Sequence, residues 1–241
     1  MGARIHPGAR HVWLRPGGVP LFFWSPPAME LRLTSHLVRE PAPPQPLGPE
    51  ALRELRQRCA LATPEDTARG MFFRGVLETV RRVGGSSLEQ RCRQGLPEKR
   101  YIDFFSYPIT QFLPLAFQAA DLLSEPCGGL AAAQRVLGQK AAHDFLESVA
   151  GRTLLMLAYD EPRLLLGQLP IGFLAAVSYG ERQMVWTGPR SGRFVMKRDF
   201  MPTAYHEGVL HAALEAVGAR DIGVRGRELG LLDSEYALSW R

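Results

Sequence analysis

The sequence predicts an α+β domain in which a helical region is followed by an antiparallel sheet of β-β-α-β-β order. Between residues 51 and 177 apolar residues recur at helical spacing, whereas from residue 183 onward short alternating segments are separated by turn-forming residues. Helices and strands are thus segregated along the chain, which is typical of α+β domains. With 46% hydrophobic residues in 241, the chain can bury a core without a metal or a disulfide.

The first fifty residues are set apart by their prolines. Residues 1–28 hold five prolines and no acidic residue, and we expect either a disordered extension or a mis-assigned start with Met29 as the true one. Residues 29–50 are expected to form a strand and a proline-rich arm, because the run from Pro41 to Pro49 can continue neither a helix nor a sheet ladder. A single α+β domain is then predicted over residues 51–241.

Seven helices are predicted before the sheet. Thr63–Asp66 is expected to start the second one, because a capping Thr, an early Pro and first-turn acids favour a helix N-terminus. The pair Gly84 and Gly85 is expected to end it. In the longest helix Val149 should face the core, and Asp144 should lie on the polar face. The predicted ranges are 51–61, 68–83, 88–94, 109–124, 130–150, 153–159 and 162–177.

The sheet is predicted from two strand pairs around one helix. Residues 183–187 and 193–197 form the first pair, joined by the turn-forming sequence 188–192. A helix over residues 205–217 follows, with Gly218 as its cap, and residues 222–228 and 235–240 form the second pair.

Charge and cysteine content argue against several classes of protein. The net charge is +5, but three arginines in residues 1–28 account for +3 of it, and the remaining charges are interspersed, so no nucleic-acid partner is expected. No apolar run approaches the ~18 residues of a membrane span, and Val19–Trp24 is too short for a secretory signal, so we expect a cytoplasmic protein. Cys59, Cys92 and Cys127 lack the spacing of a disulfide framework or a zinc site.

No complete catalytic or metal-binding motif is present. His206 and His211 are five residues apart, which turns the second about 140° from the first on a helix, so no metal site is expected there. Aromatic residues and arginines instead gather in three segments near the junction of helices and sheet. These segments are Tyr179–Arg182, Trp186–Arg190 and Pro202–Glu207, and they can form the wall of a pocket or a partner surface.

Several segments resemble an uncharacterised family that is expanded in myxobacteria, with a match from about residue 60 to the C-terminus. They include Ala68–Glu78, Asp103–Pro108, Ser178–Arg182, Trp186–Gly192, Tyr205–Leu210 and Leu231–Trp240. The layout is in turn similar to the superfamily of haem–nitric-oxide-binding domains, four-vinyl-reductase domains and transport-particle subunits.

The haem members of that superfamily place a ligating histidine shortly before the first strand of the sheet, followed by a Tyr-x-Ser-x-Arg motif. Residues 169–183 contain no histidine here, and of the motif only Arg190 matches. The resemblance therefore implies the fold without haem, and no cofactor is expected.

These observations favour a non-enzymatic sensory or scaffold domain. It would bind a small apolar or acidic ligand and act as a homodimer or through a partner protein. Trp186, Arg190, Tyr205 and His206 are the candidate ligand-binding residues, with Arg190 pairing an acidic group and the aromatic rings giving apolar contact. The alternative is an enzyme that uses Tyr205, His206 or Glu207 as acid or base, although the missing nucleophile motif favours binding.

Overall fold

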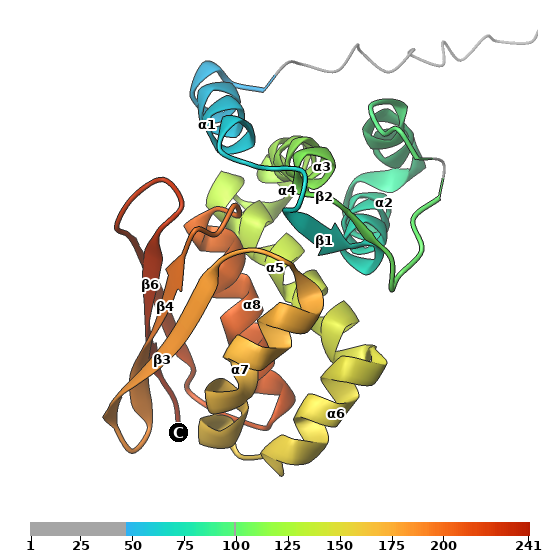
Figure 1. Ribbon diagram of the computed structural model, residues 1–241. Coiled ribbons are helices and arrows are strands. Elements are labelled where there is room, and N and C mark those ends of the chain that lie inside the picture. Colours follow the sequence, from blue (N-terminus) through green and yellow to red (C-terminus); the bar gives the residue numbers. More distant parts are fainter. Residues whose placement is uncertain (1–46, 99) are drawn as a thin grey trace, which may run out of the picture. The chain divides into compact units, whose positions relative to one another are not determined.

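The computed structural model describes residues 47–98 and 100–241 (Figure 1). The predictions for residues 1–28 and for the strand at 29–38 fall outside these residues, as does the arm up to residue 46. Helix α1 (Pro49–Ala60) begins two residues before the predicted start at Ala51, because Pro49 occupies its first turn, where a missing N–H costs nothing.

The described residues have the α+β fold that the sequence predicts. Beyond α1 its helices are α2 (Gly70–Gln94), α3 (Ile109–Leu122), α4 (Ser124–Cys127), α5 (Leu130–Glu147), α6 (Val149–Ala158), α7 (Pro162–Ala176) and α8 (Thr203–Ala216). Its strands are β1 (Thr67–Arg69), β2 (Ser106–Pro108), β3 (Glu181–Gly188), β4 (Ser191–Lys197), β5 (Gly223–Glu228) and β6 (Ser234–Ser239).

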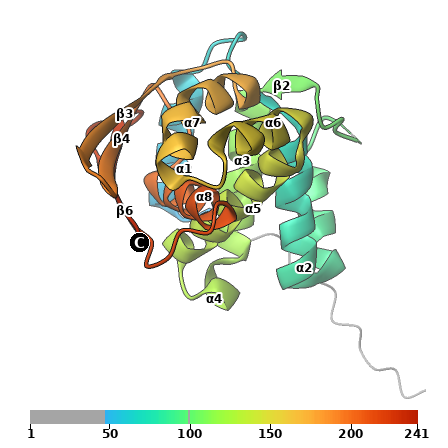
Figure 2. The ribbon, with the colours of Figure 1, turned by 90° about the horizontal axis from the view of Figure 1, so that it is seen from below.

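The predicted β-β-α-β-β order is confirmed in the larger sheet. Its four strands are antiparallel in the order β3-β4-β6-β5, and α8 connects β4 to β5. Helices α7 and α8 pack against one face of this sheet (Figures 1 and 2). Phe194 and Met196 of β4 and Tyr236 and Leu238 of β6 are buried at every second position, so the strands show the alternation of a half-buried sheet.

The predicted helix start at Thr63–Asp66 is wrong. The Asp66 carboxylate accepts hydrogen bonds from the backbone N–H and the hydroxyl of Thr63, which closes a turn instead of capping a helix. The next residues form β1, which pairs with the unpredicted strand β2, and α2 begins at Gly70. A Cβ at Gly70 would lie 2.2 Å from the carbonyl oxygen of Ile102. The start of α2 can therefore approach the backbone at Ile102 this closely because residue 70 is glycine.

The two segments predicted at 68–83 and 88–94 are the halves of α2. Gly85 has φ +86° and ψ 173°, which breaks the helix and redirects it, so that the second half continues to Gln94. The glycine pair thus changes the direction of the helix at the place where the sequence predicts its end.

The predicted long helix over residues 130–150 is divided at Ser148. This residue is extended, its hydroxyl accepts a hydrogen bond from the N–H of Gly151, and α6 starts after it. Val149 is consequently 86% exposed, which contradicts the prediction that it faces the core. Asp144 was expected on the polar face of α5, but its side chain is buried against Gly75 of α2.

Helices α5 and α8 cross at very short range, and this crossing positions the start of α8. A Cβ on Gly138 would lie 1.9 Å from the carbonyl oxygen of Tyr205, and one on Gly208 would lie 2.1 Å from that of Arg135. Each glycine therefore lets the backbone of the other helix approach. None of the helices in residues 47–98 and 100–241 is long and apolar enough to cross a membrane.

Candidate functional site

An apolar cavity of about 70 Å³ lies where α2, α3 and α5 meet α7 and α8. Apolar side chains, such as Phe72, Phe112 and Phe173, and alanines form most of its wall. Since a water molecule takes up ~30 Å³ in the liquid, the cavity can hold an apolar molecule of a few heavy atoms. Its polar lining residues are Tyr179, Asp199, Tyr205 and His206.

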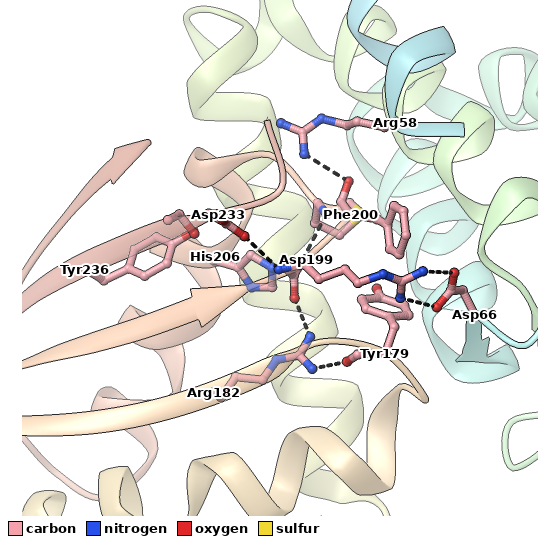
Figure 3. A network of polar contacts seen from close by, with 12 residues as sticks. Arg58, Asp66, Tyr179, Arg182, Asp199, Phe200, His206, Asp233 and Tyr236 are labelled. Atoms are coloured by element: carbon pink, nitrogen blue, oxygen red, sulfur yellow. Dashed lines mark hydrogen bonds and ion pairs between the residues drawn. The ribbon is translucent and has the colours of Figure 1, made fainter. Parts of the chain in front are cut away.

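A buried charged cluster adjoins the cavity, and two of its residues, Asp199 and His206, are part of the cavity wall. Figure 3 shows the contacts of this cluster. The Asp199 carboxylate hydrogen-bonds to Nε2 of His206 at 2.7 Å, accepts from the N–H of Met201 at 3.0 Å and forms an ion pair with Arg182. The side chains of Arg182, Asp199 and His206 are only 1%, 2% and 4% exposed. A buried carboxylate and a buried guanidinium are stable only when paired, and the hydrogen bond from Asp199 to His206 joins the imidazole to this pair.

Aromatic rings surround this charged cluster. The Arg182 guanidinium lies 4.9 Å from the ring centre of Phe173 and donates a hydrogen bond to the carbonyl oxygen of Tyr179. The Tyr179 ring packs edge-on against Phe200. Burial raises the pKa of Tyr179 and of Tyr205 well above the ordinary value, so both hydroxyls stay protonated at neutral pH.

The segment between β4 and α8, which we call the 198–201 connector, ties the cavity to several elements. Arg198, with φ +52°, makes two hydrogen bonds to Asp66 at 2.6 and 2.8 Å, and its N–H donates to Asp233. The carbonyl oxygen of Phe200 accepts from Arg58 of α1 at 3.4 Å. Figure 3 shows these contacts around Asp199. A displacement of the connector would therefore change contacts both in the helical part and next to the sheet.

The structure brings together two of the four predicted ligand-binding residues. Tyr205 and His206 both line the cavity. Trp186 is not among the lining residues; it lies 4.0 Å below the guanidinium of Arg163 and packs edge-on against Trp240. Arg190 is exposed in the turn between β3 and β4.

Glu207, which belongs to the alternative enzyme site, points elsewhere. Its carboxylate accepts hydrogen bonds from Arg135 at 2.7 Å and from the N–H of Gly226 at 2.8 Å. Sequence reasoning missed Asp199 as a site residue, because a single acid after a strand carries no motif. Arg182 falls within the aromatic and arginine segments that the sequence does single out.

A second, larger hollow of about 490 Å³ lies between α2 and residues 100–104. Two of its three arginines are already neutralised: Arg74 pairs with Glu78 and Asp103, and Arg93 with Glu89. These exposed pairs leave the hollow with little net charge to attract a ligand. The cavity at Asp199 is therefore the better candidate site.

Solved structures of similar fold define the class of this domain. An Fe(II) unliganded H-NOX protein from K. algicida has a TM-score of 0.57 and 11% identity over 72% of this chain and 96% of its own. An H-NOX protein from S. oneidensis in the Fe(II)NO ligation state has a TM-score of 0.56 and 11% identity, and the match covers 72% of this chain and 99% of that protein. These likenesses show an H-NOX-like fold, and at such identities they show the fold alone.

Within that fold, the chain belongs to the family described as "Protein of unknown function (DUF2378)", whose model matches residues 61–241. This confirms the resemblance to an uncharacterised family and the related layout of the haem–nitric-oxide-binding superfamily. No curated protein matches the sequence.

The residues at the cavity do not fit haem. A cavity of about 70 Å³ is far smaller than the ~300–1,000 Å³ of ordinary ligand pockets. Among the residues that the structure describes, His206 is the only histidine that lines it, and its Nε2 is engaged by Asp199. In the described part of the chain no three metal-ligating side chains of His, Cys, Asp or Glu gather at one place.

Proposed function

We propose that this protein is a non-enzymatic sensory domain that binds a small apolar molecule in the cavity and acts in the cytoplasm through a second copy or a partner protein. The observation that carries the proposal is the apolar cavity with Asp199 in its wall, a buried carboxylate held by Arg182 and His206. Occupancy of the cavity would act on Asp199 and hence on the 198–201 connector, which contacts both parts of the domain.

The charges at the site favour an apolar ligand over an acidic one. Among the described residues that line the cavity there is no arginine or lysine, and Arg182, which adjoins the wall through Asp199, is paired with that carboxylate. Arg190, which we expected to pair with an acidic group, lies in the exposed β3–β4 turn. An acid entering the cavity would lose its hydration without finding an unpaired cation, which is costly.

The pairing of His206 favours binding over catalysis. In a hydrolytic triad a carboxylate orients one ring nitrogen and the other contacts a nucleophile. Here Asp199 holds Nε2, and the buried Nδ1 has no hydrogen-bond partner among the described residues. Glu207 is bound to Arg135 and Gly226, so it does not assist His206.

Xenon tests the cavity directly, because it is an apolar atom known to enter cavities of this kind. We expect saturable binding of xenon to the full chain, followed by xenon-129 NMR. Ala176→Leu fills the cavity from α7 and should abolish this binding. The matched variant Ala175→Leu changes the neighbouring residue, which does not line the cavity, and should retain it.

Equal xenon binding by the wild type and Ala176→Leu would overturn the proposal, and so would no binding by the wild type. A native mass spectrum of the full chain purified from cells adds a second readout. A bound small apolar molecule that Ala176→Leu loses would identify the ligand by its mass.

A further inference from the structure

The outer sides of α6 and α7 carry a group of exposed apolar side chains, which we call the α6–α7 face. The two helices pack side by side (Figures 1 and 2). On α6, Val149, Met156 and Leu157 are 86%, 68% and 56% exposed. On α7, Ile171 and Leu174 are 63% and 66% exposed. Large apolar side chains grouped in this way are typical of an interaction surface rather than of solvated helices.

The charges near this face lie at the two ends of α6. Arg152 is in the first turn, and Asp160 and Glu161 follow the last turn. All three are exposed, and none takes part in the ion pairs formed within the described residues. Arg163, the charged residue of α7, is held over the ring of Trp186 in β3 and donates a hydrogen bond to the carbonyl oxygen of Gly188. With one base and two acids, the face does not have the basic character that attracts an anionic membrane.

A second copy of the chain complements this arrangement. Met156 stands four residues after Arg152 and four before Asp160. If a two-fold axis passes close to Met156, the two α6 helices run antiparallel, and the start of each meets the end of the other. Arg152 of one copy then lies near Asp160 and Glu161 of the next, and the contact occurs twice because the interface is isologous.

We infer that the protein forms a two-fold homodimer through the α6–α7 face, with antiparallel α6 helices at its centre. Met156 packs against its own copy at the axis, and Arg152 pairs across it with the two acids. The exposed residues of α7 extend the apolar contact on either side.

The α6–α7 face also connects to the cavity, and this part of the inference rests on the proposed function. Helix α7 has two sides: Leu169, Gly172 and Ala176 line the cavity, whereas Ile171 and Leu174 lie in the outer face. A ligand that moves α7 therefore changes the dimer surface, so cavity occupancy and dimerisation are coupled.

Sedimentation of the full chain over a range of concentrations tests the dimer. We expect a monomer–dimer equilibrium that Met156→Glu abolishes and that Arg152→Glu weakens by at least about tenfold. Phe104→Glu is the matched control, because Phe104 is 69% exposed but lies outside this face, and it should leave the equilibrium unchanged. Circular dichroism confirms that each variant is folded.

A charge exchange tests the antiparallel pairing itself. In the triple variant Arg152→Glu, Asp160→Asn, Glu161→Arg, the opposite charges face each other again with reversed signs, and dimerisation should return. Asparagine is chosen at 160 because φ there is +56°, a conformation that Asn tolerates. Failure of the triple variant to regain the dimer overturns the antiparallel arrangement.

The remaining outcomes are also decisive. A chain that stays monomeric at all concentrations, or a dimer that Met156→Glu leaves intact, overturns the inferred interface. A monomer that binds phosphatidylcholine vesicles through Met156 would assign the face to lipid instead. If the dimer forms but neither xenon nor Ala176→Leu shifts its dissociation constant, the interface stands and the coupling to the cavity fails.

Discussion

Asp199 and Asp144 are two aspartates buried to the same degree, with side chains 2% and 3% exposed, yet their surroundings differ. Both oxygens of Asp199 have partners: Oδ1 is held by His206 and the N–H of Met201, and Oδ2 by Arg182. Asp144 pairs with Lys140 through Oδ1 at 2.5 Å, but its Oδ2 has no partner among the described residues.

The pKa values of the two carboxyls move in opposite directions. Burial by itself raises the pKa of Asp199, but the interactions with His206 and Arg182 outweigh it and hold that pKa well below its ordinary value. At Asp144 burial outweighs the interaction with Lys140, and the pKa of the carboxyl is raised. The number of partners, not the depth of burial, therefore decides whether a buried acid contributes stability here.

The largest loss of stability is expected when the cation that pairs with Asp199 is removed. In Arg182→Met the carboxylate keeps His206 and the N–H of Met201 but loses its ion pair with the guanidinium. We expect the free energy of unfolding to fall by about 3–5 kcal/mol, because a buried charge is left uncompensated. Urea unfolding followed by tryptophan fluorescence, to which Trp186 and Trp240 of the domain contribute, measures this loss.

The double variant Arg182→Met, Asp199→Asn is the control, since it removes both charges together. It should be more stable than Arg182→Met alone. A loss below about 1 kcal/mol in Arg182→Met would show that the pair contributes no more than an exposed ion pair does.

Acid should affect Asp199 in a direction fixed by its lowered pKa. A carboxyl whose pKa is lower in the folded protein contributes stability above its unfolded pKa of ~3.9, and the contribution is lost as the pH falls towards the folded value. Asp199→Asn should thus be about 3 kcal/mol less stable than the wild type at pH 7. This difference in the free energy of unfolding should narrow below about pH 4. A gap that is constant between pH 7 and pH 2.5 would contradict this assignment.

The fold was largely predictable because its main signals are local. Gly84 and Gly85 mark the break in α2, and the alternation of residues 193–197 marks β4. The prediction failed where distant residues decide the outcome. Thr63–Asp66 has the sequence of a helix start, but the Asp66 carboxylate closes a turn and binds Arg198, which lies 132 residues away. The sequence of residues 63–66 alone does not indicate that Arg198 will bind Asp66.

The site was predictable only in part, for the same reason. Tyr205 and His206 stand next to each other on one helix, and both reach the cavity. Asp199, by contrast, looks like any acid at a strand end, and its role depends on Arg182 and His206 meeting it from β3 and α8. The burial of Asp144 depends likewise on Gly75 of another helix.

Gly75 of α2 provides a second test, because it packs against the carboxylate of Asp144. A Cβ at this position would lie 2.1 Å from Oδ2 of Asp144, so a larger residue at position 75 would force the carboxylate to move. Gly75→Ala should lower the free energy of unfolding by about 1–3 kcal/mol through overpacking, although alanine favours the helix itself. In the Asp144→Ala background the same change should cost less than half as much. Equal costs in the two backgrounds would place the clash elsewhere.

The smallest effect, and the only one of opposite sign, is expected for Asp144→Asn. Because the pKa of Asp144 is raised by burial, its contribution to stability is full below the unfolded value of ~3.9 and is lost as the pH rises through the folded value. The charged carboxylate is thus a cost at pH 7, and asparagine removes it while Lys140 keeps Glu78 at 2.9 Å. We expect the free energy of unfolding to rise by less than about 1 kcal/mol and Tm to rise by at most about 2–4 °C, and both gains should disappear below about pH 4. A fall in Tm at pH 7 would mean that the ion pair with Lys140 outweighs the cost of burial. Both charged carboxylates would then stabilise the fold, and Asp144 would differ from Asp199 only in how much it contributes.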